Sequence, residues 1–155
     1  MRVIGLDLGE KRTGIAVSDP DGRVASALCV LDTSQLLANV PAFKRILADY
    51  QPELLVIGLP ISLDGRENQQ AARIRSQAAR LEELYGLPLE YCDERYSSKE
   101  AKSVLTQLGY NEKEMRGKTD KIAAGIMLQT WLDSRRNGLD DQTTIREENN
   151  GSIPW

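Results

Sequence analysis

Three acidic positions carry the clearest chemical signal in this sequence. Asp7 interrupts the apolar run 3–8, Asp93-Glu94 follows a second apolar segment, and Asp120 stands at the start of a helical pattern. A carboxylate inside a buried strand costs several kcal/mol unless something pairs with it. For Asp7 we therefore expect a metal ion or a phosphate as the partner.

The absence of histidine narrows the chemistry that these carboxylates could perform. The chain has 0 histidines, which excludes a Ser-His-Asp triad, a histidine general base and a histidine-ligated zinc site. An enzyme of this composition must work with carboxylates and a hard divalent metal. Three converging carboxylates predict a site for two Mg²⁺ or Mn²⁺ ions, roughly 3.5–4 Å apart, that drives attack of water on a phosphodiester.

Each acidic position also has a purely structural interpretation. Asp7 could cap a loop through backbone N–H groups, and Asp120 could be an ordinary acid in the first turn of a helix. Asp93-Glu94 could be a surface cluster that precedes a helix. Strand alternation nevertheless places Val3, Gly5 and Asp7 on one face, and the small Gly5 leaves room beside the carboxylate.

The elements that must position these residues follow from hydrophobic periodicity and turn signals. Three runs joined by short polar turns predict an antiparallel meander. Two later apolar segments, each preceded by a helical pattern, predict parallel strands reached through crossovers. The expected strands are 1–8, 13–19, 23–31, 54–59 and 88–92, and the expected helices begin near Pro41, Ala71, Ser97 and Asp120 and end near 50, 86, 109 and 134. The fold class is therefore α/β, with a five-stranded mixed sheet flanked by helices.

Composition favours one domain, residues 1–137, followed by a polar acidic tail, 138–155, that we expect to be disordered. The tail contributes the whole net charge of −3, so residues 1–137 are neutral overall. This neutrality argues against a protein that binds nucleic acid through its overall charge. No segment approaches the ~20 apolar residues of a membrane span. The chain opens directly on a strand, so we expect no signal peptide and a cytoplasmic location. Cys29 and Cys92 are not spaced as a zinc site.

Four blocks of the sequence resemble the YqgF (RuvX) family. The sequence of residues 5–9 with 12–19 is similar to the opening of that family, and 56–60 with 64–65 to its central strand and loop. The segments 93–98 and 120–124 resemble its acidic block and its last-helix motif. The resemblance spans about residues 1–133 in the expected order. The departures are mild, such as Tyr96 for leucine and Gly125 for a small aliphatic residue.

The resemblance implies an RNase H-like fold and a metal-dependent endonuclease. It implies that Asp7, Asp120 and one of Asp93 and Glu94 are catalytic and bind Mg²⁺ or Mn²⁺. We favour Glu94, with Asp93 as the alternative, because only one of two adjacent side chains can face Asp7.

Basic residues on segments that lead into the acidic positions are candidates for binding nucleic acid. They are Lys11, Arg12, Arg95, Arg116, Lys118 and Lys121. In contrast, we expect Arg66, Arg73 and Arg80 only to solvate their helix.

The resemblance also implies two substrates. Family members are described as nucleases that mature the 5′ end of 16S ribosomal RNA in ribosome biogenesis and as Holliday-junction resolvases. The low basic content favours structured RNA, with ribosomal precursor particles as partners, over a DNA junction. A non-catalytic scaffold that binds nucleic acid is a further alternative, and the sequence leaves open whether the protein is a monomer or a homodimer. A sugar-kinase-like phosphotransferase is disfavoured, because no second Asp-x-Gly turn follows Gly65.

Overall fold

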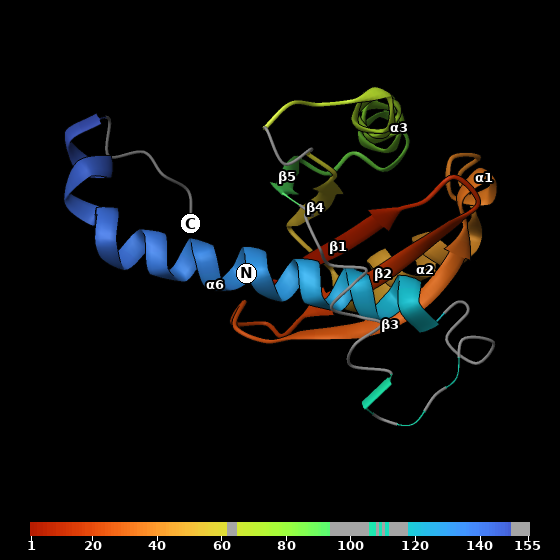
Figure 1. The fold of residues 1–155 in the computed structure, drawn as a ribbon, viewed down its shortest axis with the longest axis horizontal. Helices are drawn as coiled ribbons and strands as arrows, with labels where there is room; N and C mark the ends of the chain where they lie inside the picture. Colours follow the sequence, from red (N-terminus) through yellow and green to blue (C-terminus); the bar gives the residue numbers. More distant parts are fainter. Residues whose placement is uncertain (62–64, 94–105, 108, 110, 112–117, 150–155) are drawn as a thin grey trace.

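The computed structural model describes residues 1–61, 65–93, 106, 107, 109, 111 and 118–149, of which Lys118 and 137–149 are described by their backbone alone. In chain order the elements are β1 (Val3–Leu8), β2 (Arg12–Ser18), β3 (Ala25–Asp32), α1 (Thr33–Leu36), α2 (Pro41–Tyr50), β4 (Leu54–Leu59), α3 (Gln69–Tyr85), β5 (Leu89–Asp93) and α6 (Lys118–Asn149). Figure 1 shows α6 lying across the sheet and continuing past its edge.

The strands form one mixed sheet in the order β3-β2-β1-β4-β5. β2 pairs antiparallel with both β1 and β3, whereas β4 pairs parallel with both β1 and β5. Short turns join the antiparallel strands, and the helices α2 and α3 supply the crossovers that parallel pairing requires. The predicted meander followed by two parallel strands is confirmed.

The two faces of the sheet bury different residues, as strand alternation predicts. Ile4, Leu6 and Leu8 of β1 lie in a core that also contains Phe43 of α2 and Ile74 of α3. Val3 of β1 belongs to a second core, formed with the residues Ala124, Met127, Leu128 and Trp131 of α6. Asp7 therefore shares its face of β1 with the residues that pack against α6.

Helix boundaries follow the local signals. Pro41 occupies the first turn of α2, where the missing N–H costs nothing. The side chain of Asn68 accepts a hydrogen bond from the N–H of Ala71 at the start of α3. Gly86 ends α3 with a φ of 72°, a conformation that glycine adopts without strain.

The last helix is longer than the periodicity predicts. α6 continues to Asn149, whereas the apolar pattern places its end near Ser134. The sequence 118–149 contains no proline, and Gly138 costs a helix only about 1 kcal/mol. The segment therefore carries no strong stop signal. The division into a domain, 1–137, and a disordered tail stays a prediction, and the helix expected over 97–109 lies almost wholly outside the described residues.

Candidate active site

Asp7 lies near the end of β1, on the face that α6 covers. Its partner across the antiparallel pair is Gly14 of β2, and its side chain is half-buried. Gly5, two residues earlier on the same face, lies so close to α6 that a Cβ atom there would be 2.9 Å from Cβ of Leu128. The helix thus passes directly over this part of the sheet.

Gly14 brings the first turn of α6 against the sheet. A Cβ atom at Gly14 would lie 2.0 Å from the main-chain oxygen of Asp120, so no other residue fits without moving the helix. Because Gly14 is also the strand partner of Asp7, the backbones of the two aspartates both lie next to the same glycine. The structure therefore brings together Asp7 and Asp120, which are far apart in the sequence.

One carboxylate oxygen of Asp120 is buried without a hydrogen-bond donor. The side chain is 30% exposed, but its Oδ2 is buried and accepts no hydrogen bond. Nε of Arg12 lies 3.1 Å from that oxygen, as an ion pair without the alignment of a hydrogen bond. A buried oxygen that lacks a hydrogen bond retains lone pairs for a hard cation.

The turn between β1 and β2 is held by a buried hydroxyl pair. The Thr33 hydroxyl donates to the carbonyl of Gly9 at 2.9 Å and lies 2.8 Å from the Thr13 hydroxyl. The N–H of Thr33 donates to the carbonyl of Lys11 at 2.9 Å. These bonds fix the backbone of the turn that carries Lys11 and leads into Arg12, whose side chain lies beside Asp120. This support was not predicted, although Thr13 within an apolar strand was a visible signal for it.

The second acidic position lies at the end of β5. Asp93 is exposed and pairs in register with Leu59, which belongs to the core on the α2 and α3 side. Cys92, the preceding residue, faces the α6 side. Glu94, Arg95 and Arg116 lie outside the described residues.

Several basic candidates lie near the two aspartates. Lys11 is exposed on the β1–β2 turn, and the Arg12 side chain is 54% exposed. Lys121 is half-buried near Cys29 of β3. Burial raises the pKa of the Cys29 thiol, and the charge of Lys121 partly offsets this effect. The backbone of Lys118 begins α6, and its side chain lies outside the described residues.

The sequence matches the family described as "RuvX: Holliday junction resolvase" over residues 1–134. The chain belongs to the RuvX family.

Curated relatives of this RuvX chain match most of its length. Proteins from Anaeromyxobacter sp. (strain K) and Gloeothece citriformis are 41% identical over 135 residues and 39% identical over 134 residues. The matches cover 87% of this chain and 98% of the first relative, and 86% and 89% for the second. Both relatives carry the name "Putative pre-16S rRNA nuclease".

Solved structures show the RNase H-like fold of the RuvX chain. The resolvase RuvC of T. thermophilus, solved with a Holliday-junction substrate, aligns with a TM-score of 0.52 and 18% identity over 88% of this chain and 96% of that one. The fowlpox virus resolvase, solved with junction DNA, gives a TM-score of 0.51 and 11% identity over 87% and 99%. The expected fold class is confirmed.

One residue that we expected only to solvate its helix instead contacts the strand that carries Asp7 in this RuvX chain. Nη2 of Arg73, on α3, lies 3.4 Å from the carbonyl oxygen of Leu8, at the end of the strand that carries Asp7. Arg73 also donates to Gln77 at 3.1 Å, one turn further along the helix. The expectation that it only solvates α3 was wrong, because the crossover returns the start of α3 to the carboxyl end of β1.

The acidic pair fits a divalent metal only as part of a larger set. Among the described residues, no three acidic or cysteine side chains gather closely enough to hold an ion. Asp7 and Asp120 are two carboxylates, and a metal ion between them would need further ligands. None of the described helices is long and apolar enough to cross a membrane.

Proposed function

We propose that this protein is a metal-dependent endonuclease that cleaves phosphodiester bonds of structured nucleic acid, and that pre-16S rRNA is its substrate. The placement of the Asp7 and Asp120 backbones next to the same residue, Gly14, is the observation that carries this proposal. The names of the relatives favour 5′-end processing of pre-16S rRNA in ribosome biogenesis. Such a role places the protein in the cytoplasm, with ribosomal precursor particles as partners.

Asp7, Glu94 and Asp120 are the residues that we propose to hold two Mg²⁺ or Mn²⁺ ions. The buried Oδ2 of Asp120, which accepts no hydrogen bond, supports this assignment. The register of Asp93 beside Leu59, on the opposite face of the sheet from Asp7, favours Glu94 as the third ligand. Ions bound there would supply an activated water and stabilise the leaving oxygen.

The basic residues would hold the substrate phosphate and orient it for that attack. The Arg12 guanidinium lies 3.1 Å from Oδ2 of Asp120 and so provides the positive charge beside this carboxylate. A guanidinium with 54% of its side chain exposed can turn toward a phosphate when the carboxylate takes a metal. We assign the same role to Lys11, Arg95, Arg116, Lys118 and Lys121.

Substitution of Asp7 by Asn tests the proposal. We expect Asp7→Asn to abolish Mg²⁺- and Mn²⁺-dependent cleavage of a pre-16S rRNA fragment, because the neutral amide is a poor ligand for a hard cation. The variant should keep the circular dichroism spectrum of the wild type. Undiminished cleavage by Asp7→Asn would contradict the proposal.

Cleavage of a four-way DNA junction is the second candidate, which the description of the family favours. The same assay with junction DNA in place of RNA separates the two substrates. Salt-sensitive binding of RNA without cleavage of either substrate would instead support the scaffold alternative.

A further inference from the structure

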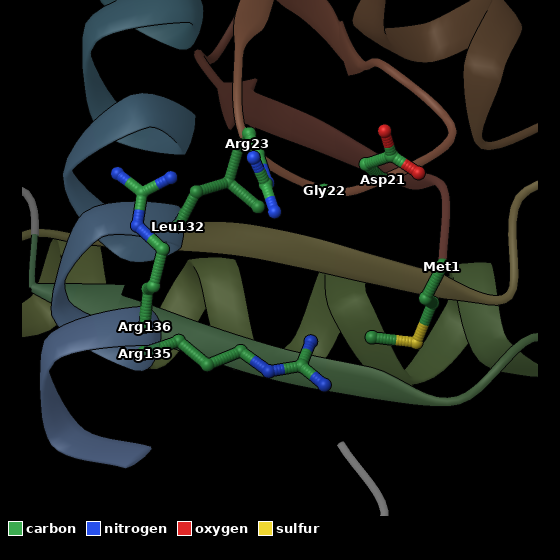
Figure 2. Close-up of a pocket in the computed structure, with 7 residues that line it drawn as sticks. All are labelled: Met1, Asp21, Gly22, Arg23, Leu132, Arg135 and Arg136. Atoms are coloured by element: carbon green, nitrogen blue, oxygen red, sulfur yellow. The ribbon is translucent and has the colours of Figure 1, made fainter. Parts of the chain in front are cut away.

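An arginine-lined pocket lies at the other end of the domain from the paired aspartates. It has a volume of about 210 Å³ and is lined by Met1, Asp21, Gly22, Arg23, Leu132, Arg135 and Arg136. Figure 2 shows Arg23, from the turn between β2 and β3, and the arginines of α6 around this hollow. Roughly 10–15 Å³ suffices for one water molecule, so the pocket can hold a larger polar group.

The wall that carries Arg23 is held firmly in place. The Asp19 carboxylate accepts hydrogen bonds from the N–H groups of Arg23 and Val24 at 2.7 and 3.1 Å. The side-chain amide of Gln129 joins this turn to α6, donating to the carbonyl of Arg23 at 2.9 Å and accepting from the N–H of Ala25 at 2.8 Å. The backbone of Arg23 is therefore positioned relative to α6 before any ligand arrives.

The arginines of α6 are also oriented by their neighbours. The Arg135 guanidinium lies over the Trp131 ring, 5.0 Å from its centroid. Nη2 of Arg136 lies 3.0 Å from a carboxylate oxygen of Asp133, and both side chains are about half exposed. Three arginines, Arg23, Arg135 and Arg136, thus line the pocket together with one acidic residue, Asp21. The pocket is positively charged in a protein whose net charge is −3.

We propose that this pocket binds a backbone phosphate of the nucleic-acid substrate, away from the bond that is cleaved. Guanidinium groups match the geometry of phosphate oxygens and form charge-assisted hydrogen bonds with them. This inference rests on the proposed nuclease function, because α6 carries both Asp120 and the arginines. Such a contact would let residues 1–137, which carry no net charge, bind the substrate through a few positioned arginines.

The length of α6 sets the distance between the two sites. Asp120 and Arg135 are 15 residues apart, which corresponds to about 22 Å along the helix at 1.5 Å per residue. A B-form DNA arm that runs along α6 rises about 3.4 Å per base pair, so the pocket phosphate would lie roughly six or seven base pairs from the cleaved one. An A-form RNA arm rises less per base pair, so the same distance spans somewhat more base pairs. The pocket should therefore act on long arms and not on short ones.

The experiment compares two double variants of equal charge. Arg23→Gln with Arg135→Gln removes one arginine from each wall of the pocket. Arg45→Gln with Arg80→Gln removes two exposed arginines from α2 and α3, on the opposite face of the sheet. Binding of labelled RNA and DNA is measured by fluorescence anisotropy in EDTA, across a salt series, with duplex arms of about 4 and about 12 base pairs.

We expect the pocket variant to bind the long arm roughly tenfold more weakly than the control variant does. The slope of log K against log salt should fall by about 1, the loss of one phosphate contact. Short arms should show no difference between the variants. A variant with lysine at both positions, Arg23→Lys with Arg135→Lys, should keep the slope of the wild type, because lysine keeps the positive charge. Equal affinities of the pocket and control variants for the long arm would overturn the proposal, as would an equal loss on short arms.

Free phosphate is the other source of the same chemistry. If inorganic phosphate raises the Tm of the wild type but not of the pocket variant, while long-arm binding is the same for both double variants, the assignment to nucleic acid is overturned. The proposed nuclease function fails separately, when the wild type cleaves no substrate with Mg²⁺ or Mn²⁺. The binding measurements need no metal, so they test whether the pocket binds phosphate even if the protein cleaves no substrate.

Discussion

At Asp120, burial disfavours the charged carboxylate, whereas the nearby positive charge of Arg12 favours it. The buried Oδ2 has lost hydration without gaining a hydrogen bond, and the nearby charge of Arg12 offsets part of that cost. A pair that is this exposed contributes only about 0–1 kcal/mol to stability. The ion pair therefore contributes little to holding the fold together, in keeping with the metal-binding role that we propose for Asp120.

Asp93 and Glu94 are adjacent but should differ sharply in their effect on cleavage. Glu94→Gln should reduce Mg²⁺-dependent cleavage by more than about a hundredfold, since even outer partners of metal sites matter roughly 10- to 100-fold. Asp93→Asn should retain most activity, because its register beside Leu59 directs it to the other face. Single-turnover cleavage with both variants measures the difference. A larger loss in Asp93→Asn than in Glu94→Gln would reverse the assignment.

Two glycines test how tightly α6 must approach the sheet. At Gly14 a Cβ atom would lie 2.0 Å from the main-chain oxygen of Asp120, so Gly14→Ala must push α6 away. We expect it to lower the free energy of unfolding by about 1–3 kcal/mol. The variant should also cleave more slowly than the wild type at temperatures well below its Tm, where it is still folded, because Asp120 moves relative to Asp7.

Gly125 is the matched control for Gly14, on the same helix. A Cβ atom there would meet its nearest neighbour, the N–H nitrogen of Ala27, at an ordinary 3.6 Å. Gly125→Ala should stabilise the protein by about 1 kcal/mol through helix propensity, and so raise the Tm by roughly 2–4 °C. Thermal unfolding by circular dichroism measures both variants. Equal shifts of Tm would show that the close contact at Gly14 does not control the packing of α6.

The turn between β2 and β3 should make stability depend on pH through Asp19. Hydrogen bonds from the N–H groups of Val24 and Arg23 lower the pKa of Asp19. A lowered pKa means that the charged form stabilises the fold above the unfolded pKa of about 3.9, and that this contribution is lost as the pH falls through the lower folded value. Asp19→Asn should therefore lower the Tm at pH 7 but not in strong acid. Asp21→Asn, in the same turn, is the control, and a Tm difference for Asp19→Asn that persists at the lowest pH would contradict this explanation.

For the whole molecule, we expect residues 1–137 to fold and act without the rest of the chain. Every buried hydrophobic residue in the described part of the chain lies at or before Leu132, and the family match ends at residue 134. A chain shortened after Asn137 should keep its Tm and its cleavage activity. Circular dichroism and the cleavage assay check this expectation. A substantially lower Tm would show that 138–155 contributes to the domain.

The sequence determined the elements and their order, because these depend on neighbours along the chain. Apolar runs bounded by turn signals located five strands, and strand alternation placed Asp7 on the same face of β1 as Val3. The structure shows that α6 covers this face. Pro41 and Gly86 marked helix ends because their effects on backbone conformation are local. The end of α6 was misplaced, since the apolar face stops at the edge of the core while the helix continues.

The tertiary structure alone decided which side chains meet. The approach of Asp120 to Gly14, the ion pair with Arg12 and the placement of Arg73 beside Leu8 join residues far apart in the sequence. The pocket of Arg23, Arg135 and Arg136 likewise combines a turn near the start of the chain with the last helix. Periodicity reports only which face of an element is apolar. Contacts between elements depend on the crossing position and depth of α6 on the sheet, which the packing of the small residues Gly5, Gly14 and Ala124 sets.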